Sequence, residues 1–322
     1  MSDAQINAGG EAEDTVREPG TLQGRRNWLS VARKEIADAG RSWQLYILTG
    51  GFLAILTLGS MSKIERGSRP QPADNQFEMT FREGLQTLAG FIEVLVPLVI
   101  LIGLHTAIAK ERERGSLRVI LTLPVSRWDV LAGTALGRAV VIAGTFLAAL
   151  AVNGLTMWVL YDSMDLLTYG KFAFAVVTLG IVFVGIAVGI SAVARTTNRS
   201  VSIAIGVFLV VTLMWEKLLG AVDLVTGVQP QFNPMAQDVA PGWRVFLYRI
   251  RPGEAWQLVV TDWIAPVMPE LGRGENTYYA RYTTPGPEPF YLDSWFLAIV
   301  LILWCIVPLL VGYWRFREAD IG

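Results

Sequence analysis

The run Phe172–Ala194 reads FAFAVVTLGIVFVGIAVGISAVA and contains no Asp, Glu, Lys or Arg. A helix that crosses a bilayer needs about 20 mainly apolar residues, because the hydrocarbon core is about 30 Å thick and each residue rises about 1.5 Å. Phe172–Ala194 meets that length without a single charge. It therefore predicts a membrane-spanning helix.

Five similar runs lie elsewhere in a chain that is unusually apolar. Of the 322 residues, 52% are hydrophobic and only 17% are charged, and the mean hydropathy is +0.43. Soluble domains carry about 25% charged residues, so six buried core helices are a poor explanation. The sequence predicts an all-α polytopic membrane protein with six transmembrane helices, at about 42–62, 91–109, 136–161, 172–194, 200–218 and 294–314.

The distribution of Lys and Arg predicts the orientation of these spans. If both termini are cytoplasmic, the inner segments hold 16 Lys and Arg in 84 residues, and the outer segments hold 11 in 118. Short cytoplasmic loops are enriched in these residues. We therefore expect a multi-pass protein of the cell (cytoplasmic) membrane with both termini in the cytoplasm.

The segments outside the spans differ in character. Residues 1–24 are polar, as in a disordered cytoplasmic tail, and residues 25–322 form the six-span domain. Apolar residues recur at helical spacing in 27–41, which predicts an amphipathic helix on the inner membrane surface. The insertion 219–293, between the fifth and sixth spans, is long and rich in Pro.

Two short amphipathic helices are expected within this insertion, at Trp243–Ile250 and Glu254–Ile264. Trp side chains are stable where lipid headgroups meet water. We therefore expect Trp243, Trp256 and Trp263 to rest on the outer membrane face. The insertion would then form a cap over the outer ends of the spans.

Composition excludes several functional classes. The formal net charge of −1 gives no overall attraction to nucleic acid. One cysteine and one histidine cannot make a disulfide framework or a multi-ligand Cys/His metal site. The chain has no Gly-x-x-x-x-Gly-Lys-(Ser/Thr) loop of the kind that cradles nucleotide phosphates.

The segment Ala109–Gly133, between the second and third spans, reads AKERERGSLRVILTLPVSRWDVLAG. Its alternating charges extend the second helix beyond the lipid, and Gly115 permits a turn. A short apolar stripe from Leu117 follows, and Pro124 ends it because proline lacks an N–H and disfavours helix in the preceding residue. Two interpretations remain open: a short surface helix that transmits movement, or a basic loop that only fixes topology.

The same segment resembles the pattern of ABC type-2 permeases, the membrane subunits of ATP-driven exporters. That pattern is a Glu-rich turn, Gly-(Ser/Thr)-Leu, a short helix, and Pro-(Val/Leu)-Ser-Arg. The matching positions are Glu111, Glu113, Gly115, Ser116, Leu117, Pro124, Val125, Ser126 and Arg127. Residues 32–36 and 316–321 also resemble the opening and closing segments of that family.

The resemblance implies a permease in which a cytoplasmic coupling helix contacts a separate ATPase chain. The ATPase chain would hold ATP and Mg²⁺, so no cofactor and no catalytic residue is expected on this chain. Two ATP sites imply two permease chains, identical or homologous. The residues expected to couple to the ATPase are Glu111, Glu113, Gly115, Leu117, Pro124 and Arg127.

Two polar residues near or within the spans are candidates for a substrate path. Glu93 lies at the outer end of the second span. Its charge either marks a substrate pathway or lies at the outer interface of the membrane. Asn153 lies at mid-depth in the third span. It could line a path or bond one helix to another.

Two other functional classes compete with the ATP-driven exporter. A proton-coupled secondary transporter would use Glu93, but such proteins place several ionisable groups or broken helices near the midplane. An intramembrane protease would need a Ser–His or paired-carboxylate arrangement within the spans. Dependence of transport on a partner ATPase separates the exporter from both. The sequence leaves the cargo open.

Overall fold

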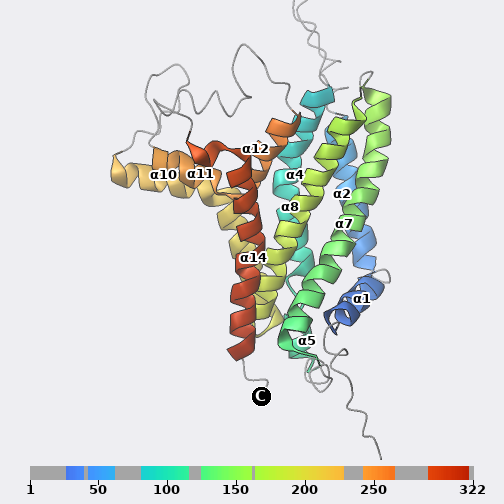
Figure 1. The fold of residues 1–322 in the computed structure, drawn as a ribbon, viewed down its shortest axis with the longest axis vertical. Helices are drawn as coiled ribbons and strands as arrows, with labels where there is room; N and C mark the ends of the chain where they lie inside the picture. The colour runs from blue at the N-terminus through green and yellow to red at the C-terminus, as the bar shows by residue number, and fades with distance from the viewer. Residues whose placement is uncertain are drawn as a thin grey trace, which may run out of the picture.

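The computed structural model describes residues 27–39, 43–61, 81–115, 125–161, 164–227, 242–264 and 289–318, and all regular structure in these ranges is helical. The predicted tail 1–24 lies outside them. Long helices run side by side in a bundle (Figure 1). They are α2 (Trp43–Ser60), α4 (Phe81–Leu104), α7 (Arg127–Leu160), α8 (Leu166–Val193), α9 (Thr197–Phe208) and α14 (Ser294–Glu318).

Among the described residues, five helical segments are long and apolar enough to cross a membrane. They are Gly84–Glu113, Arg127–Leu160, Leu166–Val193, Thr197–Thr226 and Ser294–Glu318. The remaining predicted span, 42–62, coincides with α2, whose apolar part Thr49–Ser60 falls short of that length. The all-α membrane fold is thus confirmed, whereas the first of the six predicted spans stays a prediction.

The bundle has two distinct ends (Figure 1). At the α5 end lie α1 (Asn27–Ala39), the short helix α5 (Ala109–Glu113) and the C-terminal end of α14. Toward the opposite end, the α12 end, lie α11 (Gly242–Arg249) and α12 (Pro252–Ile264). The predicted helices at 27–41, Trp243–Ile250 and Glu254–Ile264 are therefore confirmed as helices.

Helix α8 forms the centre of the bundle. Its most apolar window is 72% buried, whereas that of Thr197–Thr226 is 11% buried. Glycines allow α14 to pack closely on it: a Cβ added at Gly185 would lie 2.6 Å from the carbonyl oxygen of Cys305, and one at Gly189 would clash with that of Pro308. Small residues serve the same purpose in membrane helix pairs generally.

Helix α1 packs against α7 rather than lying free on a membrane surface. A Cβ at Gly133 would lie 2.6 Å from Val31, and one at Gly137 would lie 2.8 Å from the carbonyl oxygen of Ala32. Ala32 is buried. The apolar face that the sequence assigned to lipid is thus used largely for protein packing.

The predicted second span, 91–109, falls within a longer and interrupted helical segment. Its helix begins at Phe81 rather than at 91, and α4 ends at Leu104. The next four residues, 105–108, form a turn, and helix resumes as α5. The charged residues that follow therefore belong to a separate short helix instead of simply extending the span.

The boundary between the fifth span and the insertion 219–293 also moves. Helix continues from α9 through a π-helical segment, η2 (Leu209–Met214), into α10 (Trp215–Thr226). Figure 1 shows α10 turned across the bundle, beside α11. Trp256 was expected on the membrane face, but it is 1% exposed because its indole Nε1 donates to the carbonyl of Ala175 in α8 (2.6 Å).

The close contact between α8 and α14 makes Gly189→Ala destabilising. The added methyl group overlaps the backbone of α14, and overpacking costs about 1–3 kcal/mol. Gly144→Ala is the control, because a Cβ there meets nothing within 4 Å. Thermal unfolding in detergent should show a lower midpoint for Gly189→Ala alone. Equal midpoints for both variants would contradict the packing described here.

Candidate functional site

The turn between α4 and α5, which we call the α5 hinge (residues 105–108), is held by two serines from other helices. The Ser191 hydroxyl of α8 accepts the N–H groups of Ile108 (2.8 Å) and Ala109 (3.0 Å). The Ser200 hydroxyl of α9 donates to the carbonyl of His105. Backbone groups that leave the helical ladder thus find partners inside the protein.

Three charged side chains attach α5 to its surroundings. Glu111 pairs with Lys34 of α1 (2.8 Å), and Glu113 accepts the N–H of Thr197 (3.2 Å) and its hydroxyl. Arg112 donates to the carbonyl of Ala194 (3.0 Å). Helix α5 therefore contacts α1 and the start of α9, so its displacement would disturb both.

The sequence also predicted Gly115, Leu117, Pro124 and Arg127 to couple this chain to an ATPase. Gly115 ends α5 with a φ of 73°, in the left-handed region that favours glycine. Leu117 and Pro124 lie outside the described residues. Arg127 donates to the carbonyls of Phe316 (2.6 Å) and Arg317 (2.8 Å), at the C-terminal end of α14.

The last carbonyls of a helix carry partial negative charge and lack intrahelical partners. The positively charged guanidinium of Arg127 donates to two of these carbonyls at the end of α14. Its neighbour Ser126 caps the N-terminus of α7. The Asp129 N–H donates to the Ser126 hydroxyl (3.1 Å), and the Ser126 N–H donates to the Asp129 carboxylate (3.0 Å). The Ser-Arg pair of the family pattern thus starts α7 and joins it to α14.

The charges of α1 are tuned by burial and by their neighbours. Burial raises the pKa of the Glu35 carboxyl, although Arg138 pairs with it at 3.0 Å. Burial opposes the charge of Lys34, but the hydrogen bond to Glu111 and nearby carboxylates outweigh it, and the pKa of Lys34 is raised. Helix α1 is therefore fixed to α7 and α5 by ion pairs as well as by packing.

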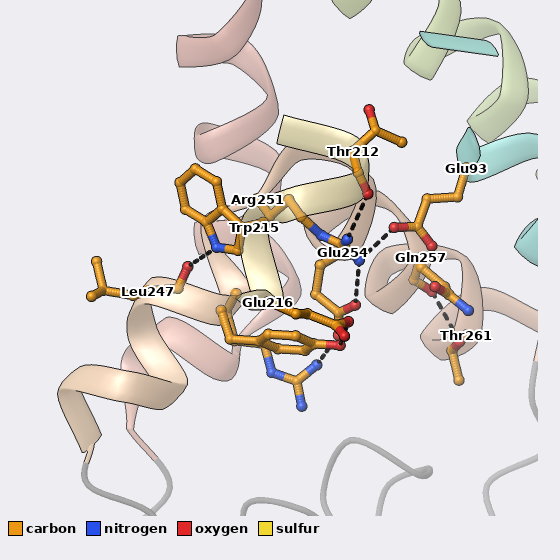
Figure 2. Close-up of polar contacts among 11 residues, drawn as sticks. Glu93, Thr212, Trp215, Glu216, Leu247, Arg251, Glu254, Gln257 and Thr261 are labelled. Carbon is orange, nitrogen blue, oxygen red and sulfur yellow. Dashed lines mark hydrogen bonds and ion pairs between the residues drawn. The ribbon is translucent and has the colours of Figure 1, made fainter. Parts of the chain in front are cut away.

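A second polar cluster lies toward the α12 end, around Arg251. Its guanidinium contacts Glu93 of α4 (2.6 Å) and Glu254 of α12 (3.4 Å), and it donates to the Thr212 carbonyl in the π-helical segment (3.4 Å). Figure 2 shows Arg251 between the two carboxylates. Arg249 also pairs with Glu254 (2.7 Å). This cluster joins α4, η2 and α12.

Burial raises the pKa of the Glu254 carboxyl, and the positive charges of Arg249 and Arg251 oppose that shift. Sequence inspection had singled out only Glu93 from this cluster. No local signal revealed Arg249, Arg251 or Glu254, since they sit in a Pro-rich insertion and meet Glu93 only through folding. Within the described residues, no group of three His, Cys, Asp or Glu could hold a metal ion.

Asn153 is fully buried among three helices. Its amide donates to the Ser60 hydroxyl of α2 (2.8 Å), and its carbonyl accepts from the Tyr169 hydroxyl of α8 (3.1 Å). Both polar groups of the amide are occupied by neighbouring helices. These contacts favour the interpretation of Asn153 as a link between helices over that of a path residue.

An interrupted helix that ends in a short charged helix, set in a bundle of membrane-spanning helices, is a feature of transporter subunits. The chain matches the model of the ABC-2 family transporter proteins over residues 29–321. It therefore belongs to the ABC-2 family of transporter proteins, and it is a multi-pass membrane subunit of an ABC transporter.

Individual relatives agree with this assignment. The chain is 26% identical over 297 residues to the probable ABC transporter permease protein NosY of Stutzerimonas stutzeri, covering 90% of this chain and 97% of the relative. It is 28% identical over 249 residues to the protein of the same name from Pseudomonas aeruginosa, covering 75% of this chain and 87% of that relative.

Replacing Ser191 by Ala should loosen the α5 hinge. The buried N–H groups of Ile108 and Ala109 would lose their acceptor, which costs about 1–3 kcal/mol. Hydrogen–deuterium exchange in 105–113 should become about tenfold faster or more. Ser202→Ala is the control, since the Ser202 hydroxyl donates only to Asn198 of its own helix. Unchanged exchange in Ser191→Ala would show that the serine does not hold the hinge.

Replacing Arg251 by Met should destabilise the protein by about 3–5 kcal/mol, because it leaves the largely buried Glu93 carboxylate without its ion-pair partner. Adding Glu93→Gln to this variant removes the unpaired charge of the Glu93 carboxylate and should restore part of the lost stability. Thermal unfolding in detergent measures both effects, with Lys217→Met on the exposed face of α10 as the control. A stability of the double variant below that of Arg251→Met would refute the pairing.

Proposed function

We propose that this chain is the membrane subunit of an ATP-driven exporter, and that α5 transmits the movement of a separate ATPase chain. The observation that carries this proposal is the attachment of α5. It follows a hinge held by Ser191 and Ser200, and its Glu111 and Glu113 contact α1 and α9. A push on α5 would therefore reach several helices at once.

In this proposal the α5 end faces the cytoplasm. The bias of Lys and Arg toward the segments at that end supports the orientation. Helix α1 and the C-terminal end of α14 both lie there, so the first and the last described helices share this end of the bundle (Figure 1). This arrangement requires an even number of crossings, and α2 then supplies the sixth span.

The transporter would contain two permease chains. The helices least buried within one chain are Thr197–Thr226 and Ser294–Glu318, whose most apolar windows are 11% and 22% buried. Such apolar surfaces need a cover of lipid or protein. They are the surfaces that a second permease chain, identical or homologous, would cover in part.

The proton-coupled alternative has less support. The carboxylate that the sequence offers for it is Glu93, whose side chain is 12% exposed and paired with Arg251. The Arg251 guanidinium lies 2.6 Å from the Glu93 carboxylate and joins it to Glu254 of α12. That environment suits a structural ion pair better than a group that must gain and lose a proton in each transport cycle.

Affinity purification from native membranes, followed by an ATPase assay on the eluate, tests the proposal. The expected result is a co-purifying chain with a phosphate-binding loop and vanadate-sensitive hydrolysis of ATP. A folded chain that purifies alone and without ATPase activity would overturn the proposal. Transport by that lone chain, driven by a proton gradient, would establish the alternative.

The double variant Glu111→Gln/Glu113→Gln tests the role of α5. Loss of both charges weakens its attachment to Lys34 and Thr197, and we expect stimulation of the ATPase by the permease to fall about tenfold, since coupling free energies are typically about 1–3 kcal/mol. Glu318→Gln, an exposed change on α14 at the same end, is the control. Undiminished ATPase stimulation and transport in the double variant would rule out coupling through these carboxylates.

A further inference from the structure

A cavity of about 830 Å³ opens at the α5 end, between α1, α4 and α7. Pockets for small ligands usually measure about 300–1,000 Å³. The wall combines apolar side chains of α4 and α7, such as Val99, Ile102 and Val141, with charged side chains of α1 and of the α5 region. This combination suits a molecule with both an apolar and a charged part.

Three of the six charged side chains that line the cavity are paired with described residues. Glu35 pairs with Arg138, and Glu113 binds Thr197. The side chains of Asp38, Lys110 and Arg114 line the same cavity, and they form no hydrogen bond or ion pair with the side chain or backbone of another residue that the structure describes. Two cations and one carboxylate are thus available. A zwitterionic group with a phosphate and an ammonium has the matching charges.

The apolar part of the wall continues toward lipid. Ile102 is 52% exposed although it belongs to a membrane-spanning segment. Beside it, a Cβ added at Gly103 would meet nothing within 4 Å, so space is open there. The cavity lies where the apolar part of α4 gives way to the charged α5. A change from apolar to charged residues along a membrane helix is the place where basic pockets bind lipid headgroups.

We propose that this cavity binds one phospholipid with a zwitterionic headgroup, its phosphate held by Lys110 and Arg114 and its ammonium by Asp38. An acyl chain lies along Val99 and Ile102. The lipid is a resident component of the fold, not a transported molecule. Its binding does not depend on the proposed function.

The cavity also connects this lipid to the α5 hinge. His105 and Thr106, two of the four hinge residues, line it. A bound headgroup covers their side of the backbone and restricts hinge opening. Lipid occupancy therefore slows hydrogen exchange in the hinge, which provides a readout separate from transport and from ATP hydrolysis.

The test uses the purified full chain in detergent micelles with dioleoyl phosphatidylethanolamine as the probe. Native mass spectrometry measures bound lipid, and hydrogen–deuterium exchange follows residues 105–115. Lys110→Ala/Arg114→Ala should weaken binding about 30-fold, which corresponds to about fivefold for each basic residue near a headgroup. Arg199→Ala/Arg315→Ala removes the same charge from exposed positions at that end and should bind as the wild type does.

Gly103→Phe provides a variant that changes no charge. Its ring fills the open space beside Ile102, so a folded Gly103→Phe protein should lose the lipid. Equal binding by the wild type and Lys110→Ala/Arg114→Ala would overturn the proposal, as would full binding by Gly103→Phe. Dioleoylglycerol lacks the phosphate and the ammonium. If it bound as tightly as dioleoyl phosphatidylethanolamine, the site would recognise only acyl chains, and the assignment of the headgroup to Lys110, Arg114 and Asp38 would be wrong. Hinge protection by inorganic phosphate alone would make it a site for free anions and refute the lipid.

Discussion

Inside a bilayer, every backbone N–H and C=O must find its partner within the protein. At two irregular segments within the described residues, the α5 hinge and the π-helical segment η2, a side chain from another part of the chain contacts the backbone. Ser191 and Ser200 bind the α5 hinge, and Arg251 binds the Thr212 carbonyl in the π-helical segment. Irregular backbone is tolerated at these points because tertiary contacts satisfy it.

Both breaks are connected to α8, the most buried helix. Ser191 lies near its C-terminal end, and the carbonyl of Ala175 receives the Trp256 indole from α12. Helix α14 packs along α8 at Gly185 and Gly189. The two irregular regions are thus built on one rigid element. A change that moved α5 relative to α8 would first have to exchange the Ser191 hydrogen bonds.

The sequence was a sound guide wherever the deciding signal was local. Uncharged runs located the long apolar helices, and five of the six predicted spans meet the criterion for crossing. Helical spacing in 27–41 predicted α1, and Gly115 predicted the turn that follows α5. Spacing could not reveal what the apolar face of α1 packs against. The glycines of α7 that receive it, Gly133 and Gly137, lie a hundred residues further along the chain.

By itself, then, the sequence determined the helical class, the approximate spans and the family resemblance, because length, hydropathy and short motifs are properties of contiguous residues. Only the tertiary structure decided how the polar residues are used. Glu93 became an ion-pair partner of Arg251, Asn153 a link among three helices, and Arg127 a cap for α14. The reason is physical: a buried polar group is stable only with its partner in place, and each of these partners comes from a distant segment that folding brings near.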